Sequence, residues 1–320
     1  MSRREHSTAA LSVGLLAVIA VAARVAHLWS FKDSVYWSLL LGDAARYHAW
    51  GAEIAAGDWL GEGVFYQSPL YPYVLGLLYK LTGPSVMAAR VLNLLLGVGA
   101  TLLLYVAATR LCGQRVGWLT AMLFTLNPSV LFHEGLLQKS SLGLCLFCGL
   151  LATLAGLSRR PRRTRDDVWL GVLAGLFALV RENAFLLLPV LLAWMQFGSG
   201  FNLTRAQRAA RGLSVVAGLL LVLLPVLARN HSFGGQWVLT TAQFGPNLWI
   251  GNGAQANGTY IPLVAEHGTP AHEQTDAKTI AEQAAGRAFR RARSRDGGRC
   301  ELLPPSAQIG VTGCGCSHRS

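Results

Sequence analysis

Long apolar runs constrain this sequence more than any other feature, because a helix that crosses a membrane needs about 20 consecutive apolar residues. Only 14% of the 320 residues are charged, whereas a soluble domain carries about 25%. The sequence therefore predicts an all-α integral membrane protein, a polytopic helical bundle of about seven spans with short helices outside the membrane. The candidate spans are residues 8–29, 86–109, 116–132, 141–157, 167–180, 184–198 and 212–228.

Two of these predictions depend on run length. The fifth and sixth runs are short, and the charges between them are Arg181 and Glu182, so they form either two helices with a tight turn or one interrupted segment. The first run lies where a signal peptide would lie. It is longer than a typical signal-peptide core and further spans follow it, which favours an uncleaved first span.

Basic residues predict how the bundle lies in the membrane. The formal net charge is +12, and the basic clusters fall on one side if the spans simply alternate. By the positive-inside rule that side is cytoplasmic, and so is the N-terminus. A nucleic-acid partner is disfavoured, because the clusters are scattered and no aromatic platform interleaves them. The clusters are Arg3 and Arg4; Arg110 and Arg115; residues 158–165; and Arg205, Arg208 and Arg211.

The same alternation divides the chain into three parts. Residues 1–229 form the membrane module, with an outer loop at 30–85 that we interpret as catalytic, and residues 230–285 form an outer polar region. Residues 286–320 are rich in Arg, Gly, Cys and Ser without periodicity, so we expect a tail that is disordered or read out of frame. The charged residues expected on the outer side include Asp43, Glu134, Arg181, Arg229 and His231.

The outer loop is expected to contain two short helices. Asp43 is expected to be the N-cap of a helix that ends near Gly57, since Asp is a favoured N-cap residue. Tyr47 and Trp50 follow it on the same helix face, as in a helix that lies at the membrane interface. The apolar run 70–82 is too short to cross a bilayer and indicates a re-entrant or surface helix.

Several stretches then occur in a familiar order, among them "GDAARYHAWGAEIAAGDW", "YQSPLYPYVLGLLYKLTG", "NPSVLFHEGLLQKSSLGLCL" and "GVLAGLFALVRENAFLLLPVLLAW". Over residues 8–285 the chain resembles the bacterial relatives of the dolichyl-phosphate-mannose protein mannosyltransferases, glycosyltransferase family 39. The resemblance implies the GT-C fold and a place in the bacterial inner membrane. It also implies transfer of a sugar from a polyprenyl-phosphate carrier, on the outer face, to a protein, lipid or glycan acceptor.

The resemblance implies roles for two acids. Asp43 occupies the position of the family's catalytic base in the first outer loop, and Glu134 matches a second acidic motif, between the third and fourth spans. The family often has a paired acid at the first site. Here Gly42 and Ala44 flank Asp43, which favours a single base. No cofactor is assigned, and the involvement of a divalent metal stays open.

Other candidate residues follow from their chemistry. Arg181 lies between two apolar runs, and arginine binds phosphate oxygens in a bidentate manner. Arg229 and His231, at the outer end of the last run, are further candidates for phosphate. Trp249 offers an aromatic face to a sugar, and Tyr47 is a substrate-binding candidate beside the base.

Each assignment has a structural alternative that the sequence leaves open. Asp43 is then only a helix cap, Glu134 an interfacial carboxylate paired with Lys139, and Arg181 a side chain that extends to lipid headgroups. Arg229 and His231 then only flank the point where the chain leaves the membrane.

Other functions are also compatible with the sequence. A transporter or flippase of lipid-linked sugars needs polar groups at mid-membrane, for which Arg24, Arg90 and Asn93 are the main candidates. A non-catalytic membrane scaffold would tolerate loss of Asp43. An inactive truncated membrane protein is the third alternative.

Overall fold

The computed structural model describes residues 3–158, 163–197, 204–253, 256–267 and 272–286. The predicted tail lies outside these residues from position 287 onward. The described residues form helices, and no strand occurs among them. The helices are α1 (Arg3–Phe31), α2 (Val35–Ser38), α3 (Asp43–Ala55), α4 (Leu70–Thr82), α5 (Val86–Cys112), α6 (Gln114–Thr125), α7 (Pro128–Gly135), α8 (Ser140–Leu157), α9 (Thr164–Ala178), the 3-10 helix η1 (Glu182–Leu186), α10 (Leu187–Phe197), α11 (Arg205–Gly234), α12 (Phe244–Asn252) and α13 (Glu273–Ala285).

Four of these helices are long and apolar enough to cross a membrane: α1 from Leu11, α5, α8 and α11. The prediction of an all-helical membrane protein with several spans is therefore confirmed. The other three predicted runs coincide with shorter helices. These are α6, α9 and α10, with 12, 15 and 11 residues.

The run 116–132 does not form one helix, because a strong helix start lies inside it. The Asn127 side chain accepts hydrogen bonds from the backbone N–H groups of Ser129 and Val130, at 3.0 and 3.3 Å. Pro128 follows at the first helical position, where its fixed φ suits a helix and its missing N–H is not needed. The run is therefore divided into α6 and the short α7.

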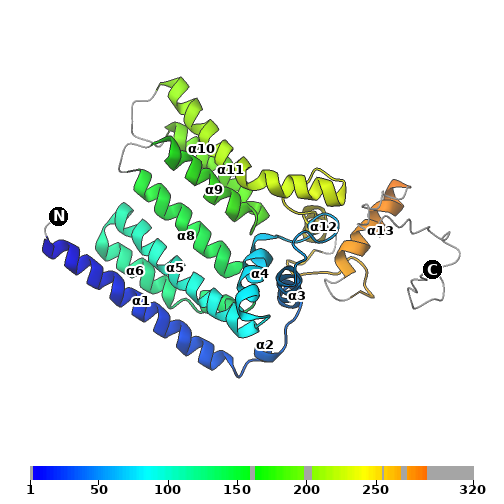
Figure 1. Cartoon of the computed structure of the whole chain (residues 1–320), viewed down its shortest axis with the longest axis horizontal. Helices are drawn as coiled ribbons and strands as arrows, with labels where there is room; N and C mark the ends of the chain where they lie inside the picture. The colour runs from blue at the N-terminus through cyan, green and yellow to red at the C-terminus, as the bar shows by residue number, and fades with distance from the viewer. Residues whose placement is uncertain (1–2, 159–162, 198–203, 254–255, 268–271, 287–320) are drawn as a thin grey trace.

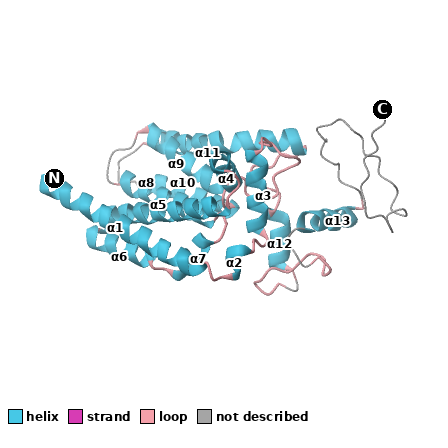
Figure 2. Ribbon diagram, turned by 60° about the horizontal axis from the view of Figure 1, so that its bottom comes forward, coloured by secondary structure: helices cyan, strands magenta, loops and turns pink. Residues whose placement is uncertain are grey.

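The long helices run side by side, and several of the short helices gather at one end of the bundle (Figures 1 and 2). In both views α2, α3, α12 and α13 lie at the end opposite the N-terminus. The outer loop connects the end of α1 to the start of α5 at this end. The segments that the alternation of spans places outside the membrane thus come together.

Helices α9 and α11 pack with their backbones in direct contact. A Cβ atom added to Gly171 would overlap the carbonyl of Val215, and one added to Gly218 would overlap the carbonyl of Val168. Small residues permit this close approach, which dispersion forces stabilise inside a membrane. Helix α11 extends to Gly234, so the predicted boundary after residue 229 falls within this helix.

Helices α3 and α4 pack against each other as a pair. Tyr47 and Ile54 are fully buried and Trp50 is 8% exposed. The Tyr47 ring meets Tyr71 of α4 edge to face, with the centroids 5.5 Å apart, and Gly76 leaves the space that Ile54 fills. The aromatic face of α3 was expected at the membrane interface; it is internal instead, because α4 covers it.

Candidate active site

Asp43 is the first residue of α3 and does not cap the helix. The N-cap position belongs to Gly42, whose φ of 55° lies in the left-handed region that favours glycine. No side-chain hydrogen bond caps the helix, so the prediction that Asp43 is the N-cap residue was wrong. Its Oδ1 atom instead accepts a hydrogen bond of 2.8 Å from Nε2 of Gln67.

The environment of Asp43 leaves its carboxylate available. The side chain is half-buried, and Gln67 is its one hydrogen-bonding partner in the described part of the chain. A neutral amide orients a carboxylate without neutralising it.

Lys139 is a cation of this site that the sequence reasoning did not assign to it. Its ammonium donates a hydrogen bond of 2.9 Å to Oγ of Ser68, the residue after Gln67. Burial lowers the pKa of Lys139 and the charge of Arg181 lowers it further, while Asp43 and Glu182 oppose this shift. These three charges therefore lie within electrostatic reach of Lys139.

Arg181 also contacts the N-terminus of α8. Its guanidinium is exposed and donates a hydrogen bond of 3.0 Å to Oγ of Ser140, the first residue of α8. It lines an open groove of about 640 Å³ between α7, α8, α9 and the η1–α10 segment. The apolar wall of this groove includes Leu144, Phe147 and Phe177, and His133 adds a polar group. A groove of this kind suits a molecule with an apolar chain and an anionic head.

Tyr47 lies one helical turn after Asp43, and its hydroxyl is unpaired in the described part of the chain. Its ring is fully buried, and its Oη atom has no hydrogen-bonding partner among the described residues. Burial raises the pKa of Tyr47, and the negative charge of Asp43 raises it further. The hydroxyl therefore keeps its proton, and it lies inside the fold without contact with solvent.

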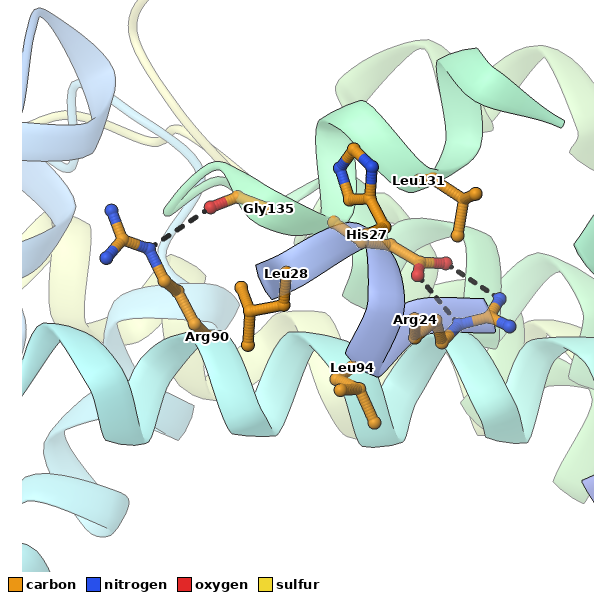
Figure 3. Close-up of a pocket in the computed structure, with 8 residues that line it drawn as sticks. Arg24, His27, Leu28, Arg90, Leu94, Leu131 and Gly135 are labelled. Atoms are coloured by element: carbon orange, nitrogen blue, oxygen red, sulfur yellow. Dashed lines mark hydrogen bonds and ion pairs between the residues drawn. The ribbon is translucent and has the colours of Figure 1, made fainter. Parts of the chain in front are cut away.

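Glu134 is bound inside the fold rather than beside Asp43. Arg24 of α1 forms an ion pair with it, with Nε 2.7 Å from Oε2 and Nη2 3.0 Å from Oε1 (Figure 3). Both side chains are buried, 2% and 5% exposed. The alternative that Glu134 pairs with Lys139 was therefore wrong. The pair joins α7 to α1, and Gly97 of α5 gives it space.

The remaining predicted residues lie elsewhere at the outer end. Arg229 donates hydrogen bonds to carbonyl groups of the outer loop, including one of 2.8 Å from Nε to Leu60. His231 stacks on Trp237, with the ring centroids 3.8 Å apart. Trp249 is 66% exposed on α12. Within the described part of the chain, none of the three predicted residues hydrogen-bonds to Asp43.

The polar region after α11 begins beside the site. The hydroxyl of Thr241 donates a hydrogen bond to the carboxylate of Glu182, and the backbone N–H of Ala242 donates one of 2.9 Å to the carbonyl of Phe65. Glu182 and Thr241 were not singled out from the sequence, because contacts between distant loops leave no periodic signal in it.

The polar side chains inside the bundle have structural partners. Arg24 donates to the Gly97 carbonyl and to Thr101, at 3.0 and 3.2 Å. Asn93 donates to the Leu136 carbonyl at 2.8 Å and accepts from the Tyr71 hydroxyl at 3.1 Å. These contacts hold helices and loops together. They leave the groups less suited to carrying a substrate across the membrane.

A divalent cation needs several oxygen or nitrogen ligands. No group of three or more His, Cys, Asp or Glu side chains placed to hold a metal occurs in the residues that the structure describes. In the first turn of α3, Asp43 is the single acidic residue. The side chains around Asp43 therefore do not form a metal site on their own.

The fold resembles the transmembrane part of GT-C-type membrane proteins. It is similar to the archaeal oligosaccharyltransferase AglB from Archaeoglobus fulgidus in complex with an inhibitory peptide and a dolichol-phosphate, with a TM-score of 0.57, 16% identity, and coverage of 89% of this chain and 37% of that one. The apo form of the Archaeoglobus fulgidus oligosaccharyltransferase is also similar, with a TM-score of 0.57, 17% identity, and coverage of 94% of this chain and 40% of that one. This chain thus spans about two fifths of those structures, and the likeness is one of fold.

The sequence profile of the dolichyl-phosphate-mannose-protein mannosyltransferases matches residues 66–228, just over half of the chain. The chain belongs to this family of glycosyltransferases, as the resemblance implied. No curated protein matches it. The matched segment includes Lys139 and Arg181 and begins after Asp43, so the role of Asp43 depends on its geometry and on the order of the motifs.

Proposed function

We propose that this chain transfers a sugar from a polyprenyl-phosphate carrier to a hydroxyl group on the extracytoplasmic side of a bacterial inner membrane. The observation that carries this proposal is the meeting of three features at one end of the bundle. They are the available carboxylate of Asp43, the cations Lys139 and Arg181, and the apolar groove that Arg181 lines. Family membership and the dolichol-phosphate bound to the similar oligosaccharyltransferase support it.

Asp43 acts as the general base in this reaction. It takes the proton of the acceptor hydroxyl, whose oxygen attacks the anomeric carbon of the sugar. The bond between that carbon and the phosphate oxygen breaks, and the carrier phosphate leaves with the electron pair. A positioned carboxylate contributes about 10²–10⁴-fold to such a step.

The cations stabilise the charge that develops on the leaving phosphate. Arg181 binds phosphate oxygens with two parallel N–H groups, and Lys139 adds a compact charge. The isoprenoid chain occupies the groove along Leu144, Phe147 and Phe177. The hydroxyl of Tyr47 is enclosed within the fold, so Tyr47 supports α3 beside Asp43 and we leave it out of direct contact with the substrate.

Not every predicted binding residue takes part in this reaction. The polar atoms of Glu134 and Arg229 are used within the fold, so we leave both out of substrate binding. Trp249 and His231 remain candidates for contact with a protein, lipid or glycan acceptor. We further propose that the segments containing α6 and α7, α9, and η1 and α10 complete the seven crossings that the orientation of the basic clusters requires, with the N-terminus in the cytoplasm.

The test is transfer of labelled sugar from a polyprenyl-phosphate donor in membranes that contain the full chain. Asp43→Asn is expected to lower transfer by about 10²–10⁴-fold. Asp33→Asn makes the same change at an exposed position of the same outer loop and is the matched control. Equal transfer by the wild type and Asp43→Asn would contradict the assignment of the base. Movement of the lipid across the membrane without product would favour a flippase instead.

A further inference from the structure

Each arm of the outer loop is held by an arginine from a membrane-spanning helix. The incoming arm, residues 32–42, leads to α3, and the outgoing arm, residues 56–69, leads away from it. Arg90, near the start of α5, binds the incoming arm. Arg229, near the end of α11, binds the outgoing arm. Both arginines are buried, at 4% and 9% exposed.

The guanidinium of Arg90 holds the incoming arm through two adjacent carbonyl groups. Its Nη2 atom donates to the carbonyls of Tyr36 and Trp37, at 3.1 and 2.7 Å. The guanidinium also lies 4.0 Å from the centroid of the Trp37 ring. Its Nε atom donates to the carbonyl of Gly135 at 3.3 Å, so the same side chain fixes the end of α7 (Figure 3).

Arg229 holds the outgoing arm in the same way. It donates to the carbonyls of Leu60 and Gly63, and its guanidinium lies 3.8 Å from the centroid of the Phe65 ring. The neighbouring Asn230 accepts a hydrogen bond of 3.1 Å from the backbone N–H of Phe65. It also donates to the carbonyl of Thr240 at 3.1 Å. The arm is thus attached to α11 at several points.

The chemistry of both contacts is specific to arginine. A guanidinium presents five N–H donors in a planar fork, so it can bind two carbonyls and stack on a ring at once, which an ammonium group cannot do. Neither Arg90 nor Arg229 forms an ion pair with a carboxylate of the described residues. Their donors go to neutral backbone groups, whose positions they fix.

We propose that Arg90 and Arg229 are positioning residues, which hold α3 so that Asp43 faces the cations Lys139 and Arg181. The two arms flank α3, and Asp43 is the residue at which the incoming arm ends. A shift of about 1 Å in a reacting group costs up to about 10²-fold in rate. This inference rests on the proposed transfer reaction.

The chain offers a matched control at the other end of α5. Arg110 donates a hydrogen bond of 2.9 Å to the carbonyl of Ala152, so it has the same chemistry far from the outer loop. Arg110→Ala therefore removes a guanidinium–carbonyl contact from the bundle without touching either arm. Any effect that is peculiar to the arms must be absent from this variant.

The experiment compares Arg90→Ala, Arg229→Ala and Arg110→Ala in the full chain reconstituted in lipid nanodiscs. Hydrogen–deuterium exchange is measured for peptides that cover the two arms, and transfer is measured as kcat and KM for the polyprenyl-phosphate sugar. Arg90→Ala is expected to speed exchange about tenfold in the incoming arm, and Arg229→Ala about tenfold in the outgoing arm. Each is expected to lower kcat about 10–100-fold and to change the donor KM little.

Three outcomes would overturn the inference. One is unchanged exchange in both arms; another is faster exchange with unchanged kcat; the third is a loss of transfer through KM alone. Arg90→Lys and Arg229→Lys keep the charge and the stem, and they replace the alanine variants if those are not recovered folded. Absence of transfer by the wild type would count against the proposed function, whereas the exchange data would still decide whether the arginines hold the arms.

Discussion

Two carboxylates at the outer end of the bundle, Asp43 and Glu134, have opposite environments. Glu134 is buried, and the guanidinium of Arg24 binds both of its oxygens. Asp43 is half-buried, and a neutral amide of Gln67 orients one oxygen. An acid whose charge is matched inside the fold stabilises the fold and has little left for a substrate. An acid that is oriented but not neutralised stays available to a substrate, so the partner of each acid indicates its role.

The largest effect that would sharpen this comparison is on stability. Glu134→Ala is expected to lower the free energy of unfolding by about 3–5 kcal/mol, because Arg24 is left buried without its partner. Asp43→Ala is expected to cost less than about 1 kcal/mol. Titration with SDS from mixed micelles measures both values.

A double variant separates the buried charge from the packing around it. Arg24→Met combined with Glu134→Leu replaces the pair by apolar side chains, and it is expected to regain most of the stability that Glu134→Ala loses. Equal losses for the Asp43 and Glu134 variants would show that the two environments do not differ as the geometry indicates.

The next effect concerns Arg181, the exposed cation that lines the groove. Arg181→Ala is expected to lower kcat/KM for the donor by about 10–150-fold, since hydrogen bonds to charged groups contribute about 1.5–3 kcal/mol. Arg46→Ala removes an exposed arginine that pairs with Glu53 at 3.3 Å, and it is the control. The same loss in both variants would point to general surface charge rather than to phosphate binding.

A smaller effect tests the space around the buried pair. Gly97→Ala is expected to cost about 1–3 kcal/mol of stability, because the added methyl overlaps Glu134 and Arg24. Gly99→Ala changes the same helix, where the nearest atom to the new carbon is Sγ of Cys145 at 3.5 Å. That variant is expected to be neutral or slightly stabilising, since Ala favours helices over Gly. Similar thermal unfolding of both would contradict the close approach at Gly97.

The smallest effect is on pH dependence. Burial and Arg181 lower the pKa of Lys139, and the ammonium must be protonated to stabilise the leaving phosphate. Transfer is therefore expected to fall as pH rises through this lowered pKa, below the usual lysine range. Lys139→Arg stays protonated and should move this alkaline decline to higher pH. The pH profile of kcat/KM from about pH 7 to 10 measures the shift; an unchanged decline would assign it to another group.

Much of the fold could be predicted from the sequence, because length and apolarity alone define a spanning helix. The runs 86–109 and 141–157 correspond closely to α5 and α8. The run 116–132 looked continuous, since composition hides a break at Asn127 that depends on capping hydrogen bonds. The covered face of α3 was not predicted either. Whether an aromatic face meets lipid or another helix is decided by tertiary packing.

Part of the proposed site was singled out from the sequence. Asp43 and Arg181 were noticed because charge beside an apolar run is conspicuous, and the structure brings both within electrostatic reach of Lys139. The role of Lys139 was missed: its proximity suggested a pair with Glu134, whereas the partner of Glu134 is 110 positions away at Arg24. Sequence spacing carries information within one helix and none about such distant pairs. For the same reason the carbonyl contacts of Arg229 could not be foreseen.

The backbone contact between α9 and α11 has a consequence for the alignment of the site. Gly171 and Gly218 lock these helices together. Arg181 follows the end of α9 by three positions, and Arg229 belongs to α11. Arg181 and Arg229, which holds the outgoing arm, therefore both belong to one unit, the closely packed pair of α9 and α11. If the surrounding lipid or a bound donor tilts α9 and α11, Arg181 and the outgoing arm move together. The distance between the donor phosphate and Asp43 then changes little.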